Sequence, residues 1–145
     1  MKLVIDQSLE NQEVQITIRC GLIDANLEKL ITQIRLYSFS LTGKRDDSIY
    51  VIKLEDIFYF ESIDEKTFIY CRKDVYESNM RLYELEQQLA ATDFVRISKS
   101  CILNVVKLES VKALLNGKME AKLINNEKVI ITRHYLQSVK EKLGL

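Results

Sequence analysis

A short run in the second half of the chain concentrates groups that bind anions. Residues 94–104 read FVRISKSCILN, in which two cations and two hydroxyls, Arg96, Ser98, Lys99 and Ser100, lie between apolar stretches. Lysine and arginine neutralise phosphates, while hydroxyls and backbone N–H groups position them. No carboxylate lies inside the run to neutralise the two cations. This composition is typical of a contact with the phosphate backbone of a nucleic acid.

Two further stretches hold residues that contact phosphates or bases. Arg133 and His134 follow Thr132 at the expected start of the last helix, where unpaired N–H groups attract anions. The planar guanidinium of Arg133 also matches the O6 and N7 acceptors of guanine. Arg81 follows Asn79 at another expected helix start. Each stretch alone is commonplace, and it is their combination in a mostly β chain that favours DNA.

The net charge of zero conceals an uneven distribution of charge along the chain. Residues 45–93 hold 6 Lys+Arg against 12 Asp+Glu, whereas residues 94–145 hold 10 against 4. Such asymmetry suits a protein that presents one basic face to a polyanion. The opposite interpretation is that segments of sequence do not correspond to faces of the fold, and that the charges serve solubility.

The sequence contains no motif that is typical of an enzyme or of a metal-binding site. His134 is the only histidine, the three cysteines at positions 20, 71 and 101 are far apart, and no nucleotide-binding or hydrolase motif occurs. We therefore expect neither catalysis nor a cofactor. No apolar stretch approaches the ~18 residues of a membrane span, and the start meets a charge at Asp6, too early for a signal peptide. These features predict a cytoplasmic protein with reduced thiols.

Hydrophobic periodicity predicts an α+β chain in which short strands predominate. Alternation and turn signals indicate strands at 13–18, 37–41, 49–54, 57–61, 67–72, 75–78, 94–97, 108–115, 118–124 and 128–132. Turns are expected at 43–47, 63–66, 116–117 and 125–126. The Asn-Gly pair at 116–117 is the strongest hairpin signal among them.

Three apolar stripes at helical spacing predict three helices. The stripes are Leu27, Leu30, Ile31 and Ile34, then Leu82, Leu85 and Leu89, then Leu136, Val139 and Leu143. Asp24, Asn79 and Thr132 are the expected N-terminal caps, and Gly144 is expected to end the last helix. The first strand–helix unit cannot bury its own apolar faces, so it must pack on the rest of the chain or on a second copy.

Residues 44–145 resemble a LytTR-type DNA-binding domain. The resemblance rests on four motifs in the family's order and spacing: IFYFES at 57–62, RLYELE at 81–86, FVRISKS at 94–100 with Asn104 after it, and VIITRHY at 129–135. It implies an elongated stack of small antiparallel β-sheets with short helices at the side. It also implies binding of double-stranded DNA, with loops that enter successive major grooves at promoter repeats.

The resemblance also implies which residues contact DNA. Matched position by position, the family's loop contacts and its basic and hydroxyl signature fall on Lys66, Thr67, Arg81, Lys99, Ser100 and Arg133. Two departures bear on these contacts. Asp64 and Glu65 lie beside Lys66 and repel phosphate, and many members carry a histidine where this chain has Ser98.

Residues 1–43 are too short for the receiver domain that the family's commonest members carry. The chain therefore resembles the subgroup without one, in which a short β–α extension takes the place of the receiver. Members of that subgroup are often encoded beside a small membrane protein thought to control them, which makes such a protein an expected partner. We predict a bacterial transcription regulator that forms a homodimer, with the extension serving dimerisation or regulation. The alternative for the extension is that its helix packs on its own β-domain.

The competing interpretation is a β-rich regulatory module that binds a protein or a small molecule instead of DNA. The zero net charge and the acidic middle segment favour it. The two interpretations differ in where the cations lie. DNA binding requires basic side chains from distant parts of the chain to meet on one face of the fold, whereas the competing module does not.

Overall fold

The computed structural model describes residues 1–37 and 39–145; the expected strand at 37–41 includes residue 38, which lies outside the described residues. The α-helices are α1 (Ala25–Tyr37), α2 (Leu82–Gln88) and α3 (Leu136–Leu143). The strands are β1 (Ser40–Arg45), β2 (Ser48–Lys53), β3 (Ile57–Ile63), β4 (Lys66–Cys71), β5 (Val75–Ser78), β6 (Phe94–Ser98), β7 (Cys101–Asn104), β8 (Leu108–Ala113), β9 (Met119–Leu123) and β10 (Lys128–Ile131). Short 3-10 turns join several of them: η1 (Leu54–Asp56), η2 (Val105–Lys107), η3 (Leu115–Gly117) and η4 (Arg133–Tyr135).

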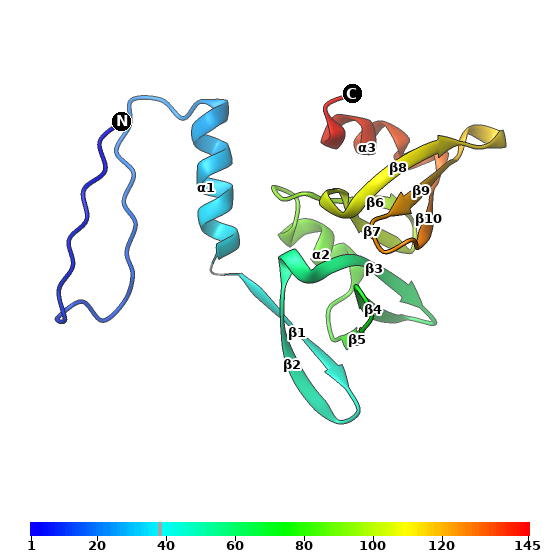
Figure 1. The fold of residues 1–145 in the computed structure, drawn as a ribbon, viewed down its shortest axis with the longest axis horizontal. Helices are drawn as coiled ribbons and strands as arrows, with labels where there is room; N and C mark the ends of the chain where they lie inside the picture. The colour runs from blue at the N-terminus through cyan, green and yellow to red at the C-terminus, as the bar shows by residue number, and fades with distance from the viewer. Residues whose placement is uncertain (38) are drawn as a thin grey trace.

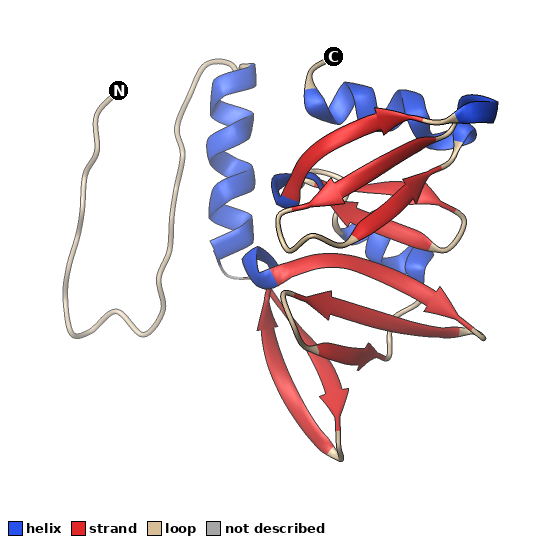
Figure 2. Ribbon diagram, turned by 45° about the vertical axis from the view of Figure 1, so that its right-hand side comes forward, coloured by secondary structure: helices blue, strands red, loops and turns tan. Residues whose placement is uncertain are grey.

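Two antiparallel sheets lie one above the other, with α2 and α3 at their sides (Figures 1 and 2). The larger sheet has the strand order β2-β1-β5-β4-β3-β7-β6, and the smaller has the order β10-β9-β8. β3 lies inside the larger sheet, and its first four residues are all buried. The prediction of a mostly β fold, built from antiparallel sheets with short helices, is confirmed.

Two apolar cores occupy opposite faces of the larger sheet. Neighbouring residues of a strand point to opposite faces, and β7 shows the division: Ile102 joins the core under α2, whereas Cys101 and Leu103 join the core under the smaller sheet and α3. The neighbours Phe60 and Tyr59 of β3 divide in the same way. Because β3 and β7 contribute to both cores, the loops at their ends have a rigid support.

The predicted stripes of α2 and α3 are confirmed as the faces that these helices turn to the cores. Leu82, Leu85 and Leu89 are buried in the first core, and Val139 is buried in the second. The stripe of α1 differs, because Leu30 remains 44% exposed in the single chain. None of the helices in the described part of the chain is long and apolar enough to cross a lipid bilayer.

One of the three expected N-terminal caps is confirmed and two are wrong. Asp24 caps α1, since its carboxylate accepts a hydrogen bond from the N–H of Leu27 (2.8 Å). The cap of α2 is Arg81 and not Asn79, because the carboxylate of Glu84 reaches back to the N–H of Arg81 (3.2 Å). The start of α2 is thus stabilised by a glutamate in its first turn, which accepts a hydrogen bond from the N–H of Arg81, and not by the expected asparagine.

The cap predicted at Thr132 is also wrong. Its hydroxyl donates to the carbonyl of Ile97 (3.3 Å), and the turn η4 separates it from α3. The hydroxyl therefore joins the two sheets instead of capping the helix. Gly144 ends α3 as predicted, with a left-handed φ of 74°.

The expected turn at 43–47 is shorter than predicted. β1 continues to Arg45, and only Asp46 and Asp47 form the turn, with φ of 50° and 66°. Gly43 is a buried strand residue, because a Cβ at this position would lie 2.6 Å from Cβ of Tyr76. Glycine is needed here for the close approach of β1 to β5 and not for a turn.

The strand predicted at 13–18 is wrong for the single chain. Residues 1–24, which we call the N-terminal arm, are extended but pair with no strand in the described structure. Figure 1 shows the arm and α1 to one side of the two sheets. A strand requires partners for its N–H and C=O groups, and the arm lies beside no sheet edge that would supply them. Its apolar side chains, among them Leu3, Ile5, Val14 and Ile16, are exposed.

Asn104 is expected to be a major polar contributor to stability. Its side-chain amide donates to the carbonyl of Ile57 (2.9 Å) inside the protein, and its side-chain oxygen accepts from the N–H of Val106 (3.2 Å). Asn104→Leu would leave a buried carbonyl without a partner, so we expect the free energy of unfolding to fall by ~1–3 kcal/mol in urea titrations. Asn125→Leu, which removes two exposed hydrogen bonds, is the matched control. Equal effects of the two variants would contradict this role.

Candidate nucleic-acid interface

One end of the strands brings the predicted contact residues together. In the antiparallel order β5-β4-β3-β7-β6, the ends of β5, β3 and β6 and the starts of β4 and β7 lie at the same end of the sheet. In the smaller sheet, the end of β10 lies beside the connection from β8 to β9. We call this end the loop edge; it consists of residues 63–66, 79–81, 98–101, 114–118 and 132–134. Figure 1 shows the β3–β4 and β8–β9 connections on its right-hand side.

Hydrogen bonds between segments distant in sequence hold the loop edge together. The N–H of Ser62 at the end of β3 donates to the carbonyl of Ser100 in the β6–β7 turn (2.8 Å). The N–H of Thr132 donates to the carbonyl of Ile97 (2.9 Å) and links the second sheet to the first. Three of the predicted contact loops are therefore fixed relative to one another by backbone bonds.

The β3–β4 turn presents Lys66 at the loop edge. Asp64 and Glu65 form the turn with φ of 50° and 67°, and all three side chains are exposed. The two carboxylates thus lie beside Lys66, as the sequence indicated. Thr67, the other predicted contact in this turn, is only 4% exposed and lies in register with Ser78 of β5. Its side chain belongs to the interior of the sheet and is not available at the surface.

Each of the three guanidinium nitrogens of Arg96 donates a hydrogen bond within the protein. Its Nε donates to the carbonyl of Ser98 (2.7 Å), one terminal nitrogen donates to Glu86 (2.7 Å) and the other donates to the carbonyl of Lys99. The side chain is 16% exposed. The geometry is that of a clamp, in which one guanidinium holds both carbonyls of the β6–β7 turn and ties the turn to α2.

The turn that Arg96 holds exposes Lys99 and Ser100. The N–H of Ser100 donates to the hydroxyl of Ser98 (3.2 Å), and the two hydroxyls lie 3.4 Å apart. Lys99, between them, is exposed and makes no ion pair within the described residues. The turn thus places one exposed ammonium group beside two hydroxyls, which is a suitable arrangement for a phosphate.

Arg133 and His134 open η4 at the same edge, and both are exposed. The aliphatic part of Arg133 lies against Gly117 of the β8–β9 connection, where a Cβ would come 3.1 Å from Cδ of the arginine. His134 stands edge-on to Tyr135, with ring centroids 4.9 Å apart. Arg81 begins α2 three residues after the end of β5 and is also exposed.

One exposed cation of the loop edge, Lys118, was not predicted from the sequence. Lys118 is exposed at the end of the β8–β9 connection, next to the glycine against which Arg133 packs. The Asn-Gly pair at 116–117 indicated this turn, and both residues adopt a positive φ there. The sequence, however, contains no local signal that the turn lies beside the start of the last helix.

The cations at the loop edge are largely free of acidic partners. The four ion pairs between described residues are Arg45–Asp74, Arg96–Glu86, Lys122–Glu109 and Lys128–Glu120. Of the predicted contact residues, only Arg96 takes part in one. Asp56, Asp74 and Asp93 lie at the opposite end of the same strands, mixed with lysines. The basic side chains therefore converge on one edge although the net charge is zero.

Comparison with known proteins assigns the family. A family model described as the LytTr DNA-binding domain matches residues 47–144. The chain belongs to the LytTR family. The sensory transduction protein LytT of Enterococcus faecalis is 37% identical over 101 residues, which cover 69% of this chain and 41% of that protein. The chain thus spans about two fifths of the length of that relative.

Two further comparisons extend the LytTR assignment. An uncharacterized HTH-type transcriptional regulator of Staphylococcus aureus is 30% identical over 147 residues, covering 100% of this chain and 99% of that protein. The structure of the LytTr DNA-binding domain of a methyl-accepting/DNA response regulator from Bacillus cereus superposes with a TM-score of 0.69 at 23% identity, covering 73% of this chain and 97% of that domain. The superposition confirms that this chain has the LytTR fold.

The thiol beneath the loop edge of this LytTR domain is not a nucleophile. Cys101 is 6% exposed, and burial raises the pKa of its thiol to about 12, with a further contribution from the nearby carboxylate of Glu61. Burial likewise raises the pKa of Cys71 to about 11. Both shifts favour the neutral thiol; Cys101 is part of the second core, and the partly buried Cys71 packs against the first.

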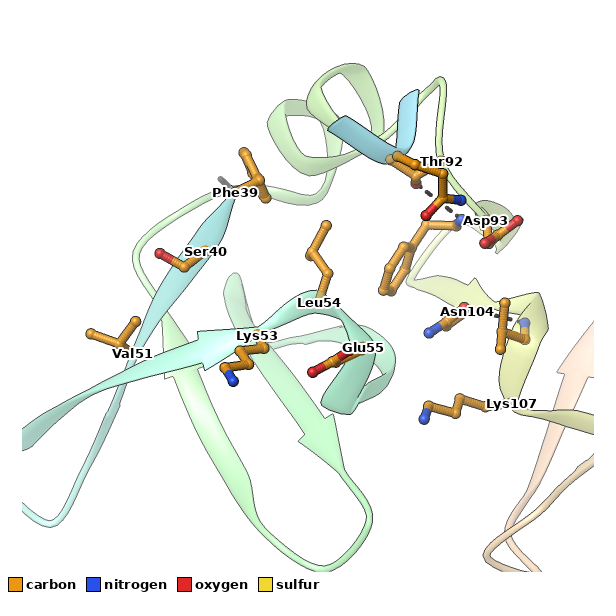
Figure 3. A pocket seen from close by; sticks show the side chains of 13 residues that line it. Phe39, Ser40, Val51, Lys53, Leu54, Glu55, Thr92, Asp93, Asn104 and Lys107 are labelled. Carbon is orange, nitrogen blue, oxygen red and sulfur yellow. Dashed lines mark hydrogen bonds between the residues drawn. The ribbon is translucent and has the colours of Figure 1, made fainter. Parts of the chain in front are cut away.

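An open groove of about 680 Å³ lies at the end of the LytTR domain away from the loop edge (Figure 3). Apolar side chains such as Phe39 and Leu54 line it together with Lys53, Glu55 and Lys107. Within the described residues, no cluster of three histidine, cysteine, aspartate or glutamate side chains is placed to hold a metal ion. None of the predicted contact residues lines this groove, so the loop edge remains the candidate site.

Proposed function

We propose that this protein is a transcription regulator that binds double-stranded DNA in a sequence-specific manner through the loop edge. The supporting observation is that exposed cations from five separate connections converge at one end of a LytTR domain: Lys66, Arg81, Lys99, Lys118 and Arg133. Free, exposed cations gathered on one edge create the positive potential that attracts a polyanion. Loops at the ends of stacked sheets suit contacts with successive grooves.

The residues of the loop edge divide into two roles in this proposal. Lys66, Arg81 and Lys99 contact phosphates, with the hydroxyls of Ser98 and Ser100 as additional donors. Arg133 reads a base, because a guanidinium makes a bidentate contact with guanine in the major groove. His134, beside it, adds a ring donor at the same position. The acidic turn next to Lys66 makes that lysine the weakest of the phosphate contacts.

Two residues predicted as contacts are assigned to positioning instead. Arg96 uses its guanidinium on Glu86 and on the β6–β7 turn, so it presents Lys99 without touching DNA itself. Thr67 is buried in the sheet and supports the turn that carries Lys66. Both remain necessary to the interface because they fix the loops that make it.

We further propose that the regulator acts in the cytoplasm as a homodimer, with residues 1–43 as its dimerisation or regulatory extension. The stripe of α1 is incompletely covered, and the apolar side chains of the N-terminal arm are exposed in the single chain. A dimer also suits promoter sites that come as paired repeats. Control by a small membrane protein stays a prediction, which copurification from the membrane fraction would test.

The salt dependence of binding tests the role of Lys99. The logarithm of the binding constant falls linearly with the logarithm of salt concentration, with a slope set by the number of phosphates neutralised. Lys99→Ala is expected to lower that slope by about one and to weaken binding to selected and random duplexes alike. Mobility-shift titrations across a salt series measure both quantities.

Lys73→Ala is the matched control for this experiment, because Lys73 is exposed in the β4–β5 connection at the other end of the strands. Its slope is expected to equal that of the unaltered chain. An equal drop for both lysines would mean that the loop edge is not the contact surface. If the unaltered chain binds no duplex even at low salt, and a protein partner is recovered instead, the competing β-rich module replaces this proposal.

A further inference from the structure

β2 is an exposed edge strand with an uncovered apolar face. It ends the larger sheet, so one row of its backbone N–H and C=O groups is unpaired. Ile52 points into the core, whereas Ile49 and Val51 on the opposite face are 76% and 73% exposed. A long edge strand with branched apolar residues is a template for pairing with another strand, and natural proteins normally cover or charge such edges.

The N-terminal arm contains a segment with the complementary pattern. Residues 13–18 alternate polar and apolar side chains, which is the pattern of a strand with one buried face. Val14, Ile16 and Ile18 are 90%, 59% and 39% exposed. The segment is extended yet has no strand partner in the described structure.

We propose that residues 13–18 of a second copy pair antiparallel with β2, with Val14 opposite Val51 and Ile16 opposite Ile49. In this register, both sets of apolar side chains lie on the same face and cover one another. The backbone groups of the edge gain partners, as in β-strand addition. Exchange in both directions gives a symmetric dimer, so this inference rests on the proposed homodimer and specifies its contact.

Charge supports the antiparallel direction. In this register, Arg19 lies beside Asp46 and Asp47, the two acidic residues of the β1–β2 turn. In the parallel direction, the same arginine would lie beside Lys53 at the other end of β2 and would be repelled. Opposite charges across a strand pair stabilise it, and like charges destabilise it.

If the pairing is antiparallel, the strand that pairs with β2 must come from a second copy and not from the chain's own arm. Figures 1 and 2 show α1 and the β1–β2 hairpin extending in opposite directions from the start of β1. Each is roughly 20 Å long by its number of residues. Arg19 placed beside Asp46 would thus lie roughly 40 Å from Ala25 of its own chain. The intervening residues 20–24 span at most ~20 Å, so a second copy must supply the strand.

Disulfide trapping between two singly altered chains tests the pairing. One chain carries Val14→Cys and the other Val51→Cys, both with Cys20→Ser, and they are mixed in air without DNA. We expect a covalent dimer that contains one chain of each kind. Gln15→Cys mixed with Val51→Cys is the control, because its side chain faces the other side of the strand, and it should cross-link at least tenfold more slowly.

Two outcomes would overturn the proposal. One is the absence of a covalent dimer although both chains are folded by circular dichroism. The other is a chain with both Val14→Cys and Val51→Cys that closes within itself and remains a monomer, which would make the chain's own arm the occupant. Because no DNA is present, failure here is distinct from failure of the DNA-binding proposal.

Sedimentation equilibrium of the full chain gives an independent measurement. The unaltered chain is expected to be a dimer, and Val51→Lys on the exposed face of β2 is expected to raise the dissociation constant at least tenfold. Ile130→Lys, at a 41% exposed position in β10 of the smaller sheet, is the matched control and should leave it unchanged. Equal dissociation constants for all three chains would contradict the role of β2.

Discussion

Replacing Arg133 with alanine is expected to lower the affinity for the cognate duplex by ~1–3 kcal/mol, on the order of 10- to 100-fold, with a much smaller effect on random DNA. Arg133 is exposed at the loop edge, and its aliphatic part is held against Gly117, so the guanidinium is directed by its surroundings. The planar fork of donors on a guanidinium matches the two acceptors of guanine. Mobility-shift titration of both duplexes at one salt concentration measures the effect.

Arg133→Lys separates charge from geometry. The lysine keeps the positive charge but lacks the planar fork, so we expect binding to random DNA to persist while preference for the cognate duplex is lost. Lys73→Ala again controls for a general loss of charge. If Arg133→Ala weakens cognate and random duplexes by the same factor, Arg133 contacts phosphate only, and base reading must come from another residue of the edge.

The second large effect is expected at Arg96, for which we propose that it supports the turn carrying Lys99 and does not itself contact DNA. Arg96→Met keeps the length of the side chain but removes the bonds to the carbonyls of Ser98 and Lys99 and to Glu86. Hydrogen bonds from a charged donor contribute ~1.5–3 kcal/mol, so the free energy of unfolding is expected to fall by roughly that amount. Affinity for all duplexes should fall as well, because the turn that carries Lys99 loses its support.

Urea unfolding and amide exchange distinguish positioning from contact at Arg96. The N–H of Ser62, which bonds to Ser100, is expected to exchange faster in Arg96→Met, since the turn loosens. Glu86→Gln is the matched control: it removes the ion pair, leaves both carbonyl bonds and should cost less than ~1 kcal/mol. Unchanged unfolding and exchange together with a loss of DNA binding would show that Arg96 contacts DNA directly.

The helices illustrate how much of the fold was predictable. Leu82, Leu85 and Leu89 form a stripe whose spacing is a local property, and all three are buried as the stripe predicts. Gly144 ends α3 for an equally local reason, since the left-handed φ there suits a residue without Cβ. The prediction of a strand at 13–18 was wrong for the single chain. Alternation shows which face a strand would bury, but it does not show whether a partner strand exists.

The candidate site was likewise predictable only in part. The types of side chain in the loops, such as Lys66 and Lys99, were read directly from the sequence, and their exposure follows from their position in turns. That Thr67 is buried and that Arg96 is engaged with Glu86 depends on the pairing of β4 with β5 and on the docking of α2. Neither arrangement is encoded in the few residues on either side.

By itself, the sequence determined the elements, the turns between them and the basic character of several loops, because periodicity and turn chemistry act over a few residues. Only the tertiary structure decided that those loops meet. The pairing of β3 with β7 brings Ser62 to Ser100, and a contact across 35 residues brings Thr132 to Ile97. Such contacts form because two cores close on opposite faces of one sheet, and that closure is a property of the whole chain.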